Sequence, residues 1–181
     1  MKHLDDIRGQ YHGSCTLVGN APNLAVKRLP RYCIGMNLIA RRFAVTNWRP
    51  YFYLCTDRFV LEHYHPEVQE AIAASVVAFI PHDVTSYKGD IFPLLPDAFE
   101  QEHGNTLSQA LELAIHLGYT KIDIAGVDFY TGRRLHFYPK EIDPMAELPP
   151  DEMSNRRKEL IRYHVGMMDY AESRGVELRY V

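Results

Sequence analysis

Short apolar runs recur along the chain, separated by polar turns or by stretches with helical spacing. An apolar run of this kind between turn residues is typical of a buried strand. Apolar residues at every third or fourth position are typical of a helix that packs on one face. The sequence predicts strands at 15–18, 31–36, 50–55, 75–80, 122–125 and 176–180, and helices at 66–74, 106–117 and 154–173.

The segment 104–130 carries the most regular pattern. Thr106 is expected to cap a helix, because its hydroxyl can accept a hydrogen bond from a backbone N–H of the first turn. Gly118 is expected to end that helix, as glycine does just past a C-terminus. A buried strand then leads into Gly126 and Asp128, so a carboxylate follows directly on a strand.

Three other regions are less regular. The first dozen residues are polar and predict a loosely attached lead-in. Residues 82–104 are rich in proline and aromatic residues, which predicts a long ordered connection that either lines a crevice or packs as a surface strap. The last helix is expected to pack through an apolar face made by Leu160, Ile161, Val165 and Met168.

Strands that alternate with helical stretches indicate a parallel sheet with helices on both faces. The predicted fold class is therefore α/β, a Rossmann-like three-layer sandwich with a mostly parallel sheet. A length of 181 residues is enough for a substantial core, and we expect residues 1–181 to form a single domain.

Polar residues follow several of the predicted strands. The carboxyl ends of parallel strands meet at one edge of the sheet, where open α/β sheets bind their ligands. The helix that starts at Asn105-Thr106 would bring a partial positive charge to this edge, which suits a phosphate group. The sequence thus predicts a nucleotide crevice, with polar strand ends at Asn20, Asn37, Thr56, Asp57 and Asp128.

The turn after the first strand reads Gly-Asn-Ala-Pro-Asn. Gly19 permits a close approach of the backbone, Pro22 fixes one φ angle, and Asn20 offers both a donor and an acceptor. The turn is equally consistent with a plain surface turn. It lacks the spacing of the GxGxxG dinucleotide fingerprint.

Composition and charge narrow the classes of function. A net charge of −3 gives no basic footprint, which disfavours nucleic acid as the main partner. Three scattered cysteines predict reduced, buried thiols and a cytoplasmic location. No apolar run has the length of a membrane span, and the first residues lack the apolar core of a signal peptide. A homo-oligomer is compatible with these features.

Two kinds of candidate chemistry follow the 122–125 strand. Arg133 and Arg134 form a cation pair that would neutralise a diphosphate or a sugar carboxylate, or would simply lie in solvent. His136 is a candidate general base, with a structural histidine as the alternative.

The stretches VGNAPNL and LGYTKIDIAGVDFY resemble bacterial sialyltransferases of glycosyltransferase family 42. They are also similar to a related Rossmann-like family that includes motility accessory factors and an archaeal 6-hydroxymethylpterin diphosphokinase. The first resemblance implies a transferase with a CMP-activated sugar as donor. It would place nucleotide contacts at Gly19, Asn20, Pro22, Asn37, Asn105, Thr106, Gly126, Asp128, Phe129 and Tyr130, and the polar strand end at Thr56 joins this set.

The resemblance leaves three functions open. The sialyltransferases carry a histidine base before the last helix, whereas residues 153–158 of this chain contain none. His136 and His164 are the nearby candidates, of which His136 takes that role, with Arg133 or Arg134 beside the leaving group. The pterin kinase alternative implies ATP, with Asp57 and Asp128 holding magnesium. The third alternative is a nucleotide- or sugar-binding module without catalysis.

Overall fold

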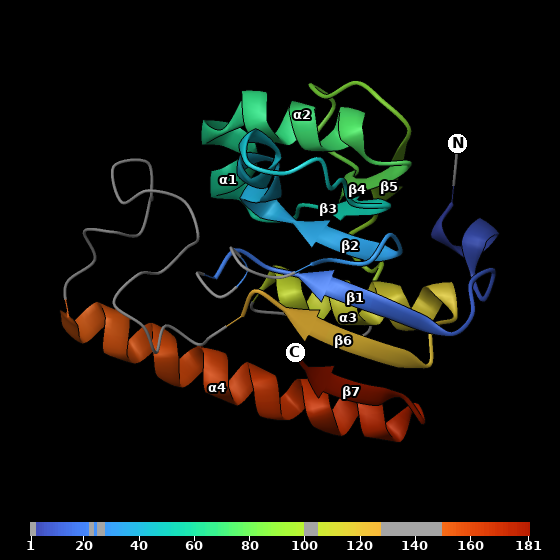
Figure 1. Cartoon of the computed structure of the whole chain (residues 1–181), viewed down its shortest axis with the longest axis vertical. Helices are drawn as coiled ribbons and strands as arrows, with labels where there is room; N and C mark the ends of the chain where they lie inside the picture. The colour runs from blue at the N-terminus through green and yellow to red at the C-terminus, as the bar shows by residue number, and fades with distance from the viewer. Residues whose placement is uncertain (1–2, 22–23, 25–27, 100–104, 128–149) are drawn as a thin grey trace.

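The computed structural model describes residues 3–21, 24, 28–99, 105–127 and 150–181. They form one parallel sheet in the order β5-β4-β3-β2-β1-β6-β7, in which every paired neighbour runs in the same direction (Figure 1). The strands are β1 (Ser14–Val18), β2 (Cys33–Met36), β3 (Phe52–Leu54), β4 (Val77–Pro81), β5 (Ile91–Leu94), β6 (Lys121–Ala125) and β7 (Glu177–Tyr180). The predicted α/β Rossmann-like fold is confirmed.

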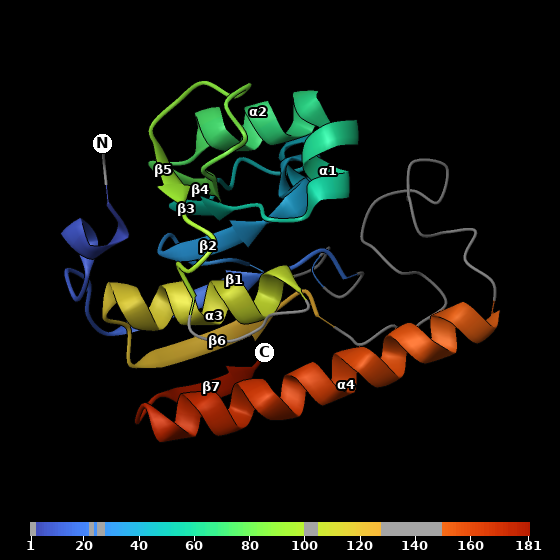
Figure 2. The same ribbon diagram turned by 180° about the vertical axis from the view of Figure 1, so that it is seen from behind.

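Helices cover both faces of the sheet (Figures 1 and 2). Helices α3 (Thr106–Leu117) and α4 (Pro150–Ser173) pack with Cys15, Leu17 and Ile122 into one core. The opposite core contains Val18 and Ala125 and is closed by the 3-10 segment η3 (Asn37–Ala44) with α1 (Arg58–His63) and α2 (His65–Ala74). Adjacent residues of a strand therefore serve different cores, as the alternation of side chains requires.

The order in which strands are added to the sheet reverses between β1 and β6. β1 pairs with β2 on one side, and each following strand up to β5 is added outward from there. After β5 the chain crosses over through α3, and β6 pairs with the free side of β1. The carboxyl ends of β1 and β6 thus flank the point where an open α/β sheet opens to a ligand.

Two predictions about irregular regions were wrong. Residues 82–104, predicted as a connection, contain the strand β5, which pairs with β4 from Ala78↔Ile91 to Pro81↔Leu94. Pro93 lies in this strand and lacks an N–H, which suits an edge strand because only one side needs to pair.

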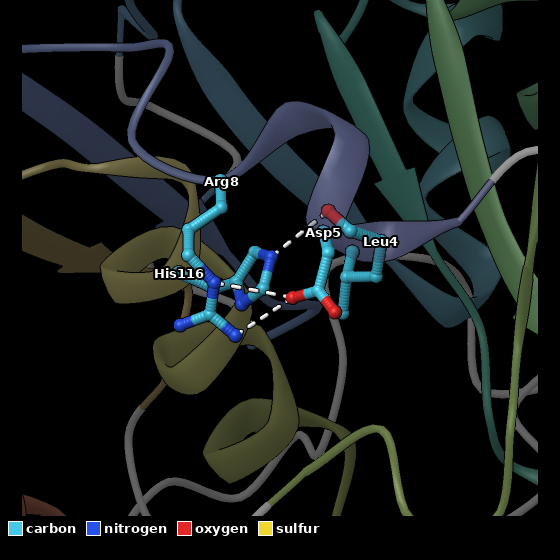
Figure 3. A network of polar contacts seen from close by, with 4 residues as sticks. All are labelled: Leu4, Asp5, Arg8 and His116. Atoms are coloured by element: carbon cyan, nitrogen blue, oxygen red, sulfur yellow. Dashed lines mark hydrogen bonds and ion pairs between the residues drawn. The ribbon is translucent and has the colours of Figure 1, made fainter.

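The first residues are attached to the core rather than loose. The segment η1 (Leu4–Ile7) packs on the end of α3, where the side chain of His116 donates from Nε2 to the carbonyl oxygen of Leu4 over 2.9 Å. Arg8 holds Asp5 in an ion pair of 2.8 Å beside this contact (Figure 3). Two backbone hydrogen bonds, from Gly9 to His116 and from Tyr11 to Leu117, fix the rest of the segment.

The three cysteines lie where the sequence predicted buried thiols. Cys15, Cys33 and Cys55 are free and at most 1% exposed. Burial raises the pKa of Cys33 and of Cys55 to about 12, so both remain protonated and act as small apolar residues. Among the described helices, none combines the length and the apolar character that a membrane crossing requires.

Candidate functional site

Two glycines bring the loops after β1 and β6 into direct contact. Gly19 donates to the carbonyl of Ala125 over 2.9 Å, and Ala21 donates to the carbonyl of Gly126 over 2.7 Å. A Cβ atom on Gly19 would lie 2.5 Å from the Gly126 oxygen, and one on Gly126 would lie 2.7 Å from the Gly19 oxygen. The two loops therefore pack directly against each other, and Asn20 lies at this contact, between Gly19 and Ala21.

Asn20 carries a buried acceptor that is not satisfied. Its side-chain Nδ2 donates to the carbonyl of Met36 over 3.4 Å, which ties the β1 loop to the end of β2. Its Oδ1 is buried and has no hydrogen-bond partner among the described residues. Leaving such an oxygen unpaired costs about 1–3 kcal/mol. An unpaired buried oxygen at the edge of the sheet is a ready acceptor for a ligand N–H or O–H group.

Asn37 follows β2 in a left-handed backbone conformation, with φ = 50°. Asparagine tolerates this conformation better than most residues. Its carbonyl accepts a 2.8 Å hydrogen bond from the hydroxyl of Tyr53, and its Oδ1 accepts one of 3.3 Å from the hydroxyl of Thr106. Asn37 is thus held by β3 through its backbone carbonyl and by the start of α3 through its side chain.

The start of α3 lies beside Asn37 and Thr56. Asn105 caps the helix by accepting from the backbone N–H of Ser108 over 3.0 Å, so the predicted cap at Thr106 was wrong by one residue. Thr106 is the first residue of the helix, and its hydroxyl lies 3.3 Å from that of Thr56. Thr56 also donates to the side-chain oxygen of Gln109, one turn further along α3. A helix start of this kind carries a partial positive charge.

We call Asn20, Asn37, Thr56, Thr106 and Gln109 the carboxyl-edge cluster. Its members are amides and hydroxyls, and they do not ionise near neutral pH. The supporting phenol of Tyr53 also stays protonated, since burial raises its pKa well above the ordinary value. The cluster is therefore suited to binding and orienting a polar ligand, and not to transferring a proton.

The cluster unites residues that the sequence predicted from three separate strand ends and one helix start. Asp57 is close in sequence, but its carboxylate accepts from the backbone N–H of Val60 over 3.3 Å and caps α1. No group of three or more His, Cys, Asp or Glu residues that could hold a metal ion occurs in the described part of the chain. The other predicted site residues, Pro22, Asp128, Phe129, Tyr130, Arg133 and His136, lie outside the described residues.

Sequence reasoning missed Gln109 and Tyr53. Gln109 is a polar residue one turn after the helix start, so the three-residue spacing from Thr106 is a signal that it faces the same edge. Tyr53 lies inside an apolar strand, and nothing in its sequence context distinguishes it from a core aromatic residue. Its hydroxyl instead supports the backbone of Asn37.

Two hollows in the described surface lie away from the cluster. One, of about 550 Å³, lies over β1 and β6 and is lined by Thr16, Arg28 and Asp123 among others. The second, of about 240 Å³, lies between η1 and the end of α3, beside His116. Neither is lined by a residue of the carboxyl-edge cluster.

The fold also occurs in solved sialyltransferases. One is the sialyltransferase CstII from Campylobacter jejuni in complex with a substrate analogue, cytidine-5'-monophosphate, at a TM-score of 0.54 and 14% identity over 92% of this chain and 79% of that chain. Another is CST-II in complex with a trisaccharide acceptor and CMP, at a TM-score of 0.50 and 13% identity over 92% of this chain and 80% of that chain.

At this level of identity, the likeness establishes the fold alone. The chain matches no protein-family profile and no curated protein sequence. The two structures support the fold that the sialyltransferase resemblance implies. They give no support to the motility accessory factor or pterin kinase part.

Proposed function

We propose that this protein is a glycosyltransferase that takes its sugar from a CMP-activated donor. The observation that carries the proposal is the carboxyl-edge cluster, which gathers amide and hydroxyl groups from β1, β2, β3 and α3 at the point where the sheet reverses its order. The shared fold of a sialyltransferase in complex with CMP supports cytidine as the nucleotide.

Each part of the cluster has a chemical use toward such a donor. The unpaired Oδ1 of Asn20 would accept from a ribose hydroxyl or from the amino group of cytosine. The start of α3, with Thr106 at its first position, would stabilise the phosphate as negative charge develops on the leaving CMP. Asn37 would lie beside the sugar and the phosphate, and it is already oriented by Tyr53 and Thr106.

The proton-transfer step requires residues other than this cluster, because its members do not ionise near neutral pH. We assign the general base to His136 and leaving-group stabilisation to Arg133. Asp128, Phe129 and Tyr130 follow β6, and we assign them to the cytidine and its ribose. Loss of His136 should therefore abolish transfer and leave CMP binding intact.

The test is calorimetric titration of CMP, CDP and ATP, with and without magnesium, on the wild type, Asn20→Ala and Asn37→Gly. Glycine keeps the left-handed backbone at position 37 and removes only the amide. We expect CMP to bind without magnesium, and each variant to bind about tenfold more weakly, the equivalent of about 1.4 kcal/mol and within the range of one hydrogen bond.

Asn47→Ala is the matched control, because this exposed asparagine lies in the turn before β3 and outside the cluster. It should bind CMP like the wild type. Hydrolysis of CMP-sugars, followed by NMR, then tests for transferase chemistry, with His136→Ala as the inactive variant. Magnesium-dependent ATP binding in place of CMP binding would contradict the proposal and favour phosphoryl transfer. Tight CMP binding without turnover would favour a binding module.

A further inference from the structure

The apolar face predicted for the last helix points away from the core. Among the described side chains of α4, Met167 and Ala171 are buried, at 4% and 1% exposure. Ile161, Val165 and Met168 are 49%, 55% and 39% exposed. At 100° per residue these three side chains fall on one stripe, about 110° around α4 from the direction of Met167 and Ala171. Figures 1 and 2 show α4 along the outside of the molecule, beside β7.

Charged residues flank this stripe in an ordered way. Lys158 and Arg162 lie toward the start of α4, and Asp169 and Glu172 lie toward its end. All four are exposed. Within the helix, like charges are neighbours at spacings of four and three residues, which disfavours the isolated helix. Arg162 and Asp169 are separated by a rise of about 10 Å along the same helix, too far for them to form an ion pair.

The pattern is symmetric about Val165. Ile161 precedes it by four residues and Met168 follows it by three, while Lys158 and Glu172 lie seven residues to either side. In an antiparallel pair of identical helices that cross at Val165, Arg162 of one copy lies opposite Met168 of the other and one residue from its Asp169. Lys158 then lies opposite Glu172, and the apolar residues meet between them.

We propose that two copies of this chain associate through this face of α4, antiparallel and about a two-fold axis at Val165. A two-fold interface uses the same patch on both copies, so the patch must be complementary to itself. The stripe meets this condition in shape and in charge, because each basic half faces an acidic half. An anionic membrane surface would match the basic half and repel Asp169 and Glu172.

The proposed contact between the two α4 helices is short, and its length limits the affinity of the dimer. Lys158 and Glu172 are about 21 Å apart along the helix axis. A single helix pair of this length buries less surface than a permanent dimer does, so association should depend on protein concentration in the micromolar range. The ion pairs should determine partner choice more than affinity.

The test exchanges charges across the two-fold axis. Arg162→Asp and Asp169→Arg each place like charges beside each other twice in a homodimer, so each variant alone should be monomeric by sedimentation equilibrium. An equimolar mixture of the two variants restores both ion pairs and should dimerise with an affinity within about threefold of the wild type. Only an antiparallel pairing of residue 162 with residue 169 predicts this rescue.

Val165→Glu tests the centre of the same face. It brings two carboxylates together at the axis and should weaken dimerisation at least about tenfold. Val76→Glu is the matched control, because Val76 is 52% exposed and lies outside α4. Circular dichroism should show the same fold in every variant.

A wild type that stays monomeric at every concentration would overturn the proposal, including one that binds anionic vesicles instead. So would a dimer that survives Val165→Glu, or a variant mixture that remains monomeric.

Discussion

At the scale of single residues, Gly126 shows how the site depends on backbone contact. Its φ of +70° lies in the left-handed region that favours glycine. Its position also leaves no room for a side chain, because a Cβ would meet the Gly19 oxygen at 2.7 Å and the Leu24 side chain at 3.2 Å. Conformational strain and steric overlap therefore act together at this residue.

Gly126→Ala should lower the free energy of unfolding by about 2–5 kcal/mol, from about 1–2 kcal/mol of left-handed strain and about 1–3 kcal/mol of overlap. Denaturant unfolding measures this change. Gly13→Ala is the control, because Gly13 has a similar φ of +84° and open space around its Cβ position. Gly13→Ala should lower the free energy of unfolding by the strain contribution alone, about 1–2 kcal/mol. Equal losses in the two variants would show that the contact with Gly19 does not matter.

Residue patterns predicted one part of the site and missed another. Asn20, Asn37 and Thr56 were predicted because a polar residue directly after an apolar run must lie at the end of a strand. Gln109 and Tyr53 were missed because they lie inside elements, where their direction depends on how the helix and the sheet are rotated against each other. The cap was predicted one residue too late because Asn105 and Thr106 are both good cap residues.

At the scale of elements, buried strands were easier to predict than edges. The strands β1, β2, β3 and β6 are surrounded by protein and read as apolar runs. β5 carries Pro93, which counts against a strand in any sequence reading, and only its position at the sheet edge makes that proline acceptable. In α4, apolar residues occupy more than one side of the helix, and the predicted core face was wrong, because Ile161, Val165 and Met168 are exposed whereas Met167 and Ala171 are buried.

The contact between α4 and β7 should respond to pH. The ring of His164 on α4 packs edge-on against Tyr180 of β7, with ring centroids 4.6 Å apart, and a hydrogen bond joins its Nδ1 to the Tyr180 hydroxyl. Burial lowers the pKa of His164 below its usual value near 6.5. The unfolded chain therefore binds more protons than the folded chain as the pH falls through this range.

The stabilising effect of neutral His164 should be fully present above about pH 6.5 and should be lost progressively as the pH falls below that value. We expect the Tm of the wild type to fall more steeply between pH 7.5 and pH 5 than that of His164→Gln, which keeps a polar side chain but does not titrate. Melting curves at matched ionic strength measure the difference. Parallel pH profiles for the two proteins would show that His164 does not contribute.

At the scale of the whole molecule, the parallel sheet followed from the alternation of strands and helices, but the strand order did not. Placing β6 beside β1 depends on where α3 crosses, and that depends on which face of the sheet its apolar residues cover. This crossing brings Thr106 to Asn37, a contact between residues 69 positions apart. The site could therefore be predicted as a set of strand ends, whereas its link to α3 required the structure.

Binding of CMP should slow hydrogen exchange in these distant segments together. If CMP binds at the carboxyl-edge cluster, it contacts the loop after β1, the end of β2 and the start of α3 together. At a hundred times its Kd, a ligand stabilises the folded state by about 2.7 kcal/mol. Hydrogen exchange should therefore slow on CMP addition at 18–21, 36–38 and 105–109.

The amides of η1 are the internal control, because η1 packs at the other end of α3, beside His116. In Asn37→Gly, the same protection should require about tenfold more CMP. Protection at η1 that exceeds the protection at these three segments would place the ligand elsewhere.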